Sequence, residues 1–389
     1  MRTMTALTAA AAASIGLASC SAAGGGASSA SAPGPAGSTS ASGAAIAVSA
    51  SDTACTLTRT TAPTGLVKFS VSNMGTKVTE FYVYAPGDRI VGEVENVGPG
   101  VSRDLSVELT EPGTYTTACK PGMTGDGIRA PFTVTGASAT AAGSTDEKVT
   151  RAIATYQQFV ATEAEEFLTK TTEFAGAVKA GDVAKAKSLY ADARHPFEAI
   201  EPIASSFGDL DARIDGREDV VAEGKAFTGY HRLERDLWKD GLRPDSGAVA
   251  DQLVADVTAL VGEARTVKLT GLQIANGAKA LLDEVATGKI TGEEERYSHT
   301  DLSDFDGNLE GSQAALDALR PVLAERDAAL LAQLDSAFTE LKAQLAKHKA
   351  GDGYRAYTDL STDDVKALSV KLDVLSDRVA TVAAVVARQ

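Results

Sequence analysis

The spacing of apolar residues changes once along this chain of 389 residues, and that change limits what the chain can fold into. From about residue 44 to 136 apolar and polar residues alternate, as in Val67-Lys-Phe-Ser-Val-Ser72, and turn sequences such as Glu111-Pro-Gly113 interrupt the runs. Alternation with turn signals at short intervals predicts a small antiparallel β-sandwich. Beyond residue 147 the apolar residues recur every three or four positions, which predicts helices. Residues 137–146 are mostly small and form the expected linker.

The helical part, residues 147–389, is expected to be an antiparallel bundle. In its first segment Tyr156, Phe159, Phe167 and Phe174 recur at helical spacing and provide an apolar face. Long helices with short connections pack as antiparallel neighbours. Further helices are predicted near residues 217–239, 248–265, 268–288, 312–350 and 362–387.

Residues 1–20 have the features of a secretory signal peptide, with Arg2 before an apolar run. The sequence Leu17-Ala-Ser-Cys20 resembles the bacterial lipobox, whose cysteine is lipid-modified and becomes the first mature residue. Residues 21–43 are Ala, Gly, Ser, Thr and Pro without a charge, and such a stretch behaves as a flexible tether. We therefore expect a protein that is lipid-anchored at Cys20 and lies outside the cytoplasm, at the cell surface or in a periplasm. An ordinary signal peptide with an incidental cysteine is the alternative.

The formal net charge of −15 narrows the possible partners. Nucleic acid is excluded as an expected ligand, because its phosphates would be repelled. An acidic surface attracts cations, but it also keeps a protein in solution, so the charge alone does not decide between these roles.

His231 and Glu234 are the clearest candidates for a metal site. They are three positions apart in a segment expected to be helical, so their side chains can point to the same spot. Glu198 and Glu201 have the same spacing, and two buried carboxylates so close would repel unless a cation lay between them. Carboxylates with an imidazole favour iron or manganese over copper(I), with zinc as an alternative. Ordinary solvated or salt-bridged side chains are the competing interpretation.

The segment Gly229-Tyr-His-Arg-Leu-Glu234 resembles the G-x-H-x-x-E motif of the imelysin-like (M75 peptidase-like) family. Residues 196–211, 276–286 and 288–302 extend the likeness to the EfeO-type members of that family, which take part in iron uptake. The resemblance implies a duplicated four-helix unit, and an iron-binding component that passes iron to an EfeU-type permease beside an EfeB-type haem peroxidase. The helical metal ligands that it implies are His231, Glu234, Glu198, Glu201 and Asp215. A later acid from Glu293–Glu295, of which Glu294 is the choice, and Asp301 are further candidates.

The sandwich resembles a cupredoxin-like domain, because residues 112–123, from Pro112 to Met123, look like the last strand and ligand loop of that fold. A blue-copper centre needs two histidines beside its cysteine. The four histidines of the chain all lie outside residues 44–136, so that centre is excluded. Two interpretations remain for Cys55 and Cys119. They form a disulfide, as an oxidising compartment allows, or they bind copper or ferric iron together with Glu80, Glu93 and Glu95.

Two other functions compete with iron binding. A zinc-dependent peptidase of the imelysin type is the main rival, but the chain has no H-E-x-x-H sequence, and Glu234 would have to serve as either ligand or general base. The second rival, binding of an acidic polysaccharide, conflicts with the negative charge unless a cation bridges the two. We therefore expect a binding protein and not an enzyme.

Overall fold

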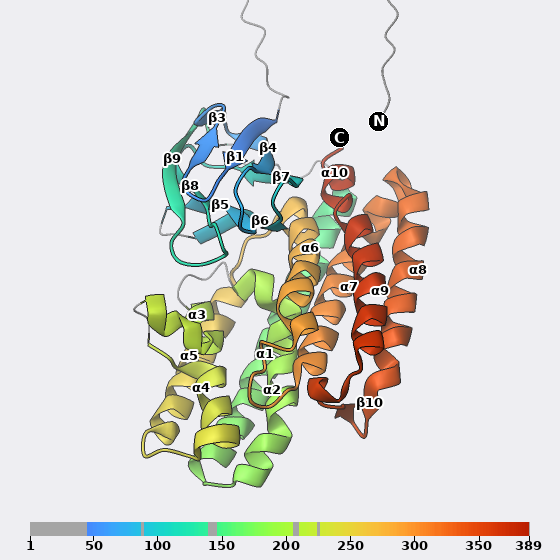
Figure 1. Ribbon diagram of the computed structural model, residues 1–389. Helices are drawn as coiled ribbons and strands as arrows, with labels where there is room; N and C mark the ends of the chain where they lie inside the picture. Colours follow the sequence, from blue (N-terminus) through green and yellow to red (C-terminus); the bar gives the residue numbers. More distant parts are fainter. Residues whose placement is uncertain (1–44, 87–88, 139–145, 205–209, 224–225, 389) are drawn as a thin grey trace, which may run out of the picture. The chain divides into compact units, whose positions relative to one another are not determined.

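The structure is a computed structural model that describes residues 45–86, 89–138, 146–204, 210–223 and 226–388 (Figure 1). The predicted signal peptide, the tether, the lipid-modified Cys20 and most of the predicted linker lie outside the described residues. Strands occupy residues 46–135 and helices dominate from residue 147 onward, so the change in periodicity corresponds to a change of secondary structure.

The N-terminal part is a sandwich of two sheets around an apolar core that includes Phe69, Phe81 and Phe132. The first sheet has the strand order β2-β1-β4-β7 and the second has the order β3-β9-β8-β5-β6. The prediction that the sandwich is antiparallel is wrong for two pairs, because β1 pairs with β4 and β3 pairs with β9 in parallel. The strands are β1 (Ile46–Ala50), β2 (Cys55–Leu57), β3 (Thr61–Pro63), β4 (Gly65–Asn73), β5 (Thr79–Ala85), β6 (Arg89–Val97), β7 (Ser102–Leu109), β8 (Gly113–Cys119) and β9 (Ile128–Thr135).

Cys55 and Cys119 form a disulfide that joins the two sheets. Cys55 begins β2 in the first sheet and Cys119 ends β8 in the second, with 5.6 Å between their Cα atoms. Their sulfurs are therefore not available as thiolate ligands in this structure.

The helical part is built from long helices that lie side by side (Figure 1). Helix α1 packs against α2, α5 and α7, whereas α7 also packs against α6 and α8. None of the described helices combines the length and the apolar character that a bilayer crossing requires. The helices are α1 (Glu147–Lys179), α2 (Val183–Ala204), α3 (Leu210–Asp215), α4 (Gly229–Arg235), α5 (Ser246–Ala264), α6 (Gly271–Thr287), α7 (Asp301–Arg326), α8 (Ala328–Leu345), α9 (Thr362–Val379) and α10 (Val382–Val386), with the short helices η2 (Glu218–Glu223), η3 (Asp236–Asp240) and η4 (Lys289–Thr291) between them.

Three predicted helix ranges are wrong. The range 362–387 contains both α9 and α10. The range 312–350 contains two helices, because Asp327 leaves the helical conformation and its side chain accepts a hydrogen bond from the backbone N–H of Leu330 at the start of α8. The range 217–239 contains the separate η2, and its α-helix begins only at Gly229. An aspartate that satisfies a free N–H at a helix start is a capping signal that apolar periodicity does not reveal.

Two glycines on α7 allow this helix to approach α2 closely. A Cβ atom at Gly311 would lie 2.0 Å from the carbonyl oxygen of Ala199, and one at Gly307 would lie 2.7 Å from the Cβ atom of Glu198. Both distances are shorter than side chains tolerate, so this separation of the helices requires glycine. The close approach brings the carboxylate of Glu198 to the side-chain amide of Asn308 on α7.

Candidate metal centre

Acidic side chains from five segments meet inside the helical part. Helix α2 contributes two, the end of α3 and helix α4 contribute one each, the loop after η4 contributes two, and the start of α7 contributes two. Most are completely or almost completely buried, which is unusual for carboxylates unless they are paired with a cation. The residues are Glu198, Glu201, Asp215, Glu234, Glu294, Glu295, Asp301 and Asp304.

His231, Glu234 and Glu295 form the group with an imidazole in which every member is buried. Each can offer one ligand atom such that all three atoms lie within 4.8 Å of one another, and all three residues are buried. His231 Nδ1 lies 3.3 Å from Glu234 Oε2 and 3.9 Å from Glu295 Oε1. A neutral imidazole with two carboxylates is a donor set that suits iron, manganese or zinc.

The backbone of the loop after η4 holds the carboxylate of Glu234 in place. Glu234 Oε1 accepts hydrogen bonds from the N–H groups of Tyr297 (2.8 Å) and Ser298 (2.7 Å). Burial alone would raise the pKa of Glu234, but the hydrogen bonds from His231, Ser298 and Tyr297 lower it below its usual value. Glu234 is therefore an anion with a fixed orientation.

The pKa values of the other two members of this group, Glu295 and His231, indicate an excess of negative charge. Burial raises the pKa of Glu295 to about 8, with Glu234 adding to the effect. Burial would lower the pKa of His231, but Asp215, Glu234 and Glu295 raise it to about 10. A site in which carboxylates retain protons and an imidazole gains one has an excess of negative charge that a metal ion would neutralise.

Two further groups meet the same distance criterion and overlap with the first. Asp215, His231 and Glu294 form one, and Glu198, Glu294 and Asp304 form the other. His231 Nε2 lies 3.5 Å from Asp215 Oδ1, so the ring faces carboxylates from both of its nitrogens.

Two basic side chains lie inside the acidic cluster and are fully buried. The guanidinium of Arg194 forms ion pairs with Asp215 and Glu198, and its Nε lies 2.8 Å from Glu295 Oε1 without the alignment of a hydrogen bond. Lys289 lies on the other side of Glu198. These cations neutralise part of the cluster, and the carboxyl groups still outnumber them.

Several buried polar atoms in the cluster have no hydrogen-bond partner. They include Nε2 of His231, Oε2 of Glu294 and both carboxylate oxygens of Asp304. An unsatisfied buried polar group costs free energy, and a missing ion is one explanation for such atoms. The donor set therefore fits a metal ion.

The structure separates the residues predicted from sequence into two sets. His231, Glu234, Asp215, Glu198 and Glu294 belong to the three groups. Glu201 and Asp301 belong to none, because Glu201 Oε2 faces Lys289 and Asp301 Oδ1 accepts the N–H of Glu295.

Sequence reasoning missed Glu295 and Asp304. Glu295 follows Glu293 and Glu294 in a loop, where spacing does not reveal which carboxylate points inward. Asp301 and Asp304 lie three positions apart at the start of α7, which is the same signal that identified Glu198 and Glu201.

The acids predicted as a sandwich site also lie close together. The hydroxyl of Tyr82 hydrogen-bonds Glu80 Oε2 (3.1 Å) and Glu95 Oε1 (3.2 Å). Burial, followed by the charge of Glu80, raises the pKa of Glu93 to about 8. Among the described residues, none of the groups that could hold a metal includes Glu80, Glu93 or Glu95.

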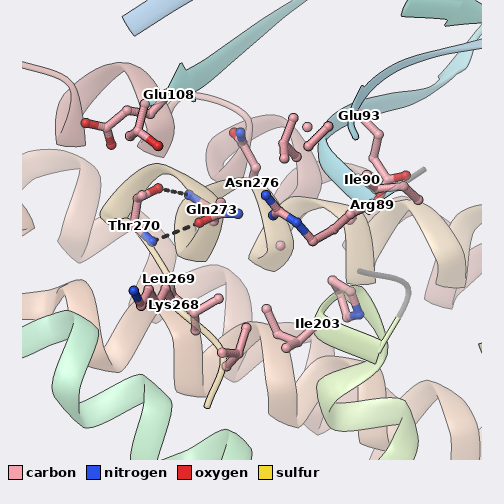
Figure 2. A pocket seen from close by; sticks show the side chains of 18 of the residues that line it. Arg89, Ile90, Glu93, Glu108, Ile203, Lys268, Leu269, Thr270, Gln273 and Asn276 are labelled. Carbon is pink, nitrogen blue, oxygen red and sulfur yellow. Dashed lines mark hydrogen bonds between the residues drawn. The ribbon is translucent and has the colours of Figure 1, made fainter. Parts of the chain in front are cut away.

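A hollow of about 940 Å³ lies outside the three groups that could hold a metal (Figure 2). It is lined by Arg89 and Glu93 of β6 and by residues at the start of α6, where Thr270 and Gln273 form a reciprocal pair of hydrogen bonds that caps the helix. Its lining contains no histidine and includes both acidic and basic side chains. We therefore place the candidate metal centre in the buried cluster and not in the larger hollow.

Gly229 has a positional role that can be tested. Its φ is +75°, and a Cβ atom there would lie 2.1 Å from the carbonyl oxygen of Ile214, the neighbour of Asp215. Gly229→Ala is expected to lower metal affinity roughly tenfold or more, comparable to the loss of a residue that supports a ligand, because α4 and Asp215 must move apart. The affinity can be measured by titration calorimetry.

Gly241→Ala is the matched control, since Gly241 also has a positive φ, of +80°, but nothing lies within 4 Å of its missing Cβ atom. This variant should lose about 1–2 kcal/mol of stability from backbone strain and retain its metal affinity. Equal metal affinity in both variants would show that the contact between Gly229 and Ile214 does not position the site.

Comparison of the sequence with known proteins assigns the helical part to a family. The family model described as Imelysin matches residues 152–382, which is more than half of the chain and includes all three groups. The chain belongs to the imelysin family. A model of the cupredoxin-like domain matches residues 10–134 of this imelysin-family protein. The iron uptake system component EfeO of Escherichia coli O157:H7 is 38% identical over 325 residues, which cover 82% of the chain and 85% of that relative. Proteins with the same name from E. coli K12 and Shigella flexneri match to the same extent.

Proposed function

We propose that this protein binds iron through His231, Glu234 and Glu295 as a component of an iron-uptake system. The convergence of these three side chains in a buried position is the observation that supports the proposal most strongly. The relatives that share 38% identity are named as iron uptake system components, which supports iron as the cargo. Asp215 faces the other nitrogen of the same ring, Nε2, where it forms a separate group with His231 and Glu294.

The composition of the site favours iron or manganese over copper(I). Its oxygens come from carboxylates, its single nitrogen comes from an imidazole, and no sulfur is present in the three groups of described residues. Hard oxygen donors suit ferrous and ferric iron, and copper(I) prefers sulfur. Zinc is compatible with the same donors, so the measurement must compare the metals directly.

Titration of the metal-free protein with ferrous iron under anaerobic conditions tests the proposal. We expect one tightly bound ferrous ion per chain, because the second site, proposed below for the sandwich, takes ferric iron. Zinc and manganese are titrated in parallel. If no ferrous or ferric iron binds at concentrations where zinc does, the assignment of the cargo is wrong.

A zinc-dependent peptidase is less well supported by the geometry. A general base needs a free carboxylate that can reach a metal-bound water. Oε1 of Glu234 accepts two backbone N–H groups, and Oε2, which faces His231, would be the oxygen that binds the metal ion, so neither oxygen is free to act as a base. Zinc-dependent cleavage of a peptide library that disappears in Glu234→Gln would nevertheless establish the peptidase function.

We also propose that the chain is held outside the cytoplasm by a lipid on Cys20, and that it passes iron to an EfeU-type permease and meets an EfeB-type haem peroxidase. The sequence before residue 44 supports the anchor, and the relatives named as iron uptake system components support partners within such a system. Cell fractionation of Cys20→Ser tests the anchor, and release of this variant from membranes is the expected result. Co-purification with the permease tests the transfer.

For the sandwich we propose that Glu80, Glu93 and Glu95 bind ferric iron in preference to copper. These carboxylates are hard donors, and the disulfide leaves Cys55 and Cys119 without the thiolates that copper would prefer. Metal titration of Glu80→Gln, compared with the parent protein, tests this second site, and an unchanged iron content would contradict it.

A further inference from the structure

The ammonium group of Lys289 lies within a cage of four carboxylates. The side chain of Lys289 has no solvent exposure, which is rare for lysine. Its Nζ atom lies 2.9 Å from Glu294 Oε1, 3.2 Å from Glu198 Oε2, 3.4 Å from Glu284 Oε1 and 3.5 Å from Glu201 Oε2.

The cage has the composition of a cation site. Its oxygens come from α2, from α6 and from the loop after η4, so the fold and not a single helix assembles it. Four carboxylate donors around one point are the ligands that hard divalent cations prefer. Four carboxylates around one buried position require a counter-cation, because otherwise they would take up protons.

Two buried oxygens at the cage have no hydrogen-bond partner. One is Oε2 of Glu294, whose other oxygen contacts Lys289. The second is Oδ1 of Asn308, whose amide nitrogen donates to Glu198 Oε2 (3.2 Å) and Glu201 Oε2 (3.3 Å). These oxygens are additional donors that the ammonium group does not use, and a rotated Asn308 amide could present its oxygen to an ion.

We infer that the ammonium group of Lys289 occupies a second metal position of the bundle and keeps it closed to an ion. The inference rests on the proposed function for the first position, at His231, Glu234 and Glu295. The two positions are neighbours, because Glu294 contacts Lys289 and also forms a group with Asp215 and His231.

The consequence for iron transport is that the bundle holds one ion where its carboxylates could hold two. The fixed ammonium therefore keeps the cargo mononuclear.

Replacing Lys289 with methionine tests the inference, since methionine has a similar length and no charge. In the full mature chain, Lys289→Met is expected to bind a second ferrous ion under anaerobic conditions, where the parent protein binds one. With Mn²⁺ as the probe, electron paramagnetic resonance should change from the spectrum of one isolated ion to that of two ions close to each other. Lys289→Arg, which retains the charge, should bind a single ion.

Lys279→Met is the matched control, because Lys279 is also largely buried but pairs with a single carboxylate, that of Asp283. It should bind one ion, as the parent does. If the parent binds one ion and Lys289→Met binds no more than one, the inference is wrong and the proposed function stands. If neither binds an ion, both are wrong.

Loss of the lysine could unfold the bundle when no metal is present. In that case saturating Mn²⁺ must restore the thermal transition of Lys289→Met, because the ion replaces the missing charge. Failure of Mn²⁺ to restore folding would overturn the inference.

Discussion

Glu234→Gln is expected to weaken iron binding by at least about 100-fold, because even residues that only orient a metal ligand contribute 10–100-fold. The substitution removes one negative charge from the group formed with His231 and Glu295 while it preserves the size of the side chain. Glutamine still offers one oxygen to the N–H groups of Tyr297 and Ser298, so the loop should retain its position. Anaerobic titration calorimetry with ferrous iron measures the change, and circular dichroism confirms that the fold is preserved.

Glu163→Gln provides the control for this experiment. Burial, followed by the charges of Glu166 and Glu310, raises the pKa of Glu163 to about 7, but this glutamate lies in none of the three groups. Its substitution should leave iron affinity unchanged. If both variants lose affinity equally, a general loss of negative charge would explain the result, and Glu234 would not be a ligand.

Removing the disulfide with Cys55→Ala and Cys119→Ala is expected to destabilise the sandwich by about 4 kcal/mol. The two cysteines are separated by 64 residues, and a cross-link over a loop of that length removes much of the conformational entropy of the unfolded chain. Denaturant unfolding is followed by the tyrosine signal in near-ultraviolet circular dichroism, to which the sandwich contributes Tyr82, Tyr84 and Tyr115 and the helical part the other six tyrosines. A tyrosine transition that Trp238 fluorescence does not share reports the sandwich.

The single tryptophan of the chain, Trp238, offers an internal control within the same sample. It lies in η3 of the helical part, so its fluorescence follows unfolding of the bundle and should change little in the cysteine variant. Iron binding by the bundle should also persist. A parent sandwich that is no more stable than the variant would contradict the stabilising role of the cross-link.

Local spacing was sufficient to predict both halves of the fold and part of the centre. Alternation marked the strands, and steps of three and four residues marked the helices. His231 and Glu234 could be paired from sequence because both lie on one turn of α4, where geometry depends only on neighbouring residues. Glu198 was found for the same reason.

The remaining parts of the centre depend on contacts between distant segments. Glu295 lies in a loop whose direction is set by packing, including the hydrogen bond between its N–H and Asp301. Arg194 and Lys289 are basic residues, and burial of a cation is favourable only where several carboxylates converge. That convergence requires α2, α4 and α7 to be packed together.

The hydrogen bonds from the loop after η4 to Glu234 have a consequence for how the centre is assembled. His231 and Glu234 come from α4, whereas Glu294 and Glu295 follow more than two helices later in the chain. A fragment that ends before residue 290 contains the histidine motif but neither of the later carboxylates. An ion at the proposed site therefore cannot be held by the full donor set until the chain has folded at least as far as this loop.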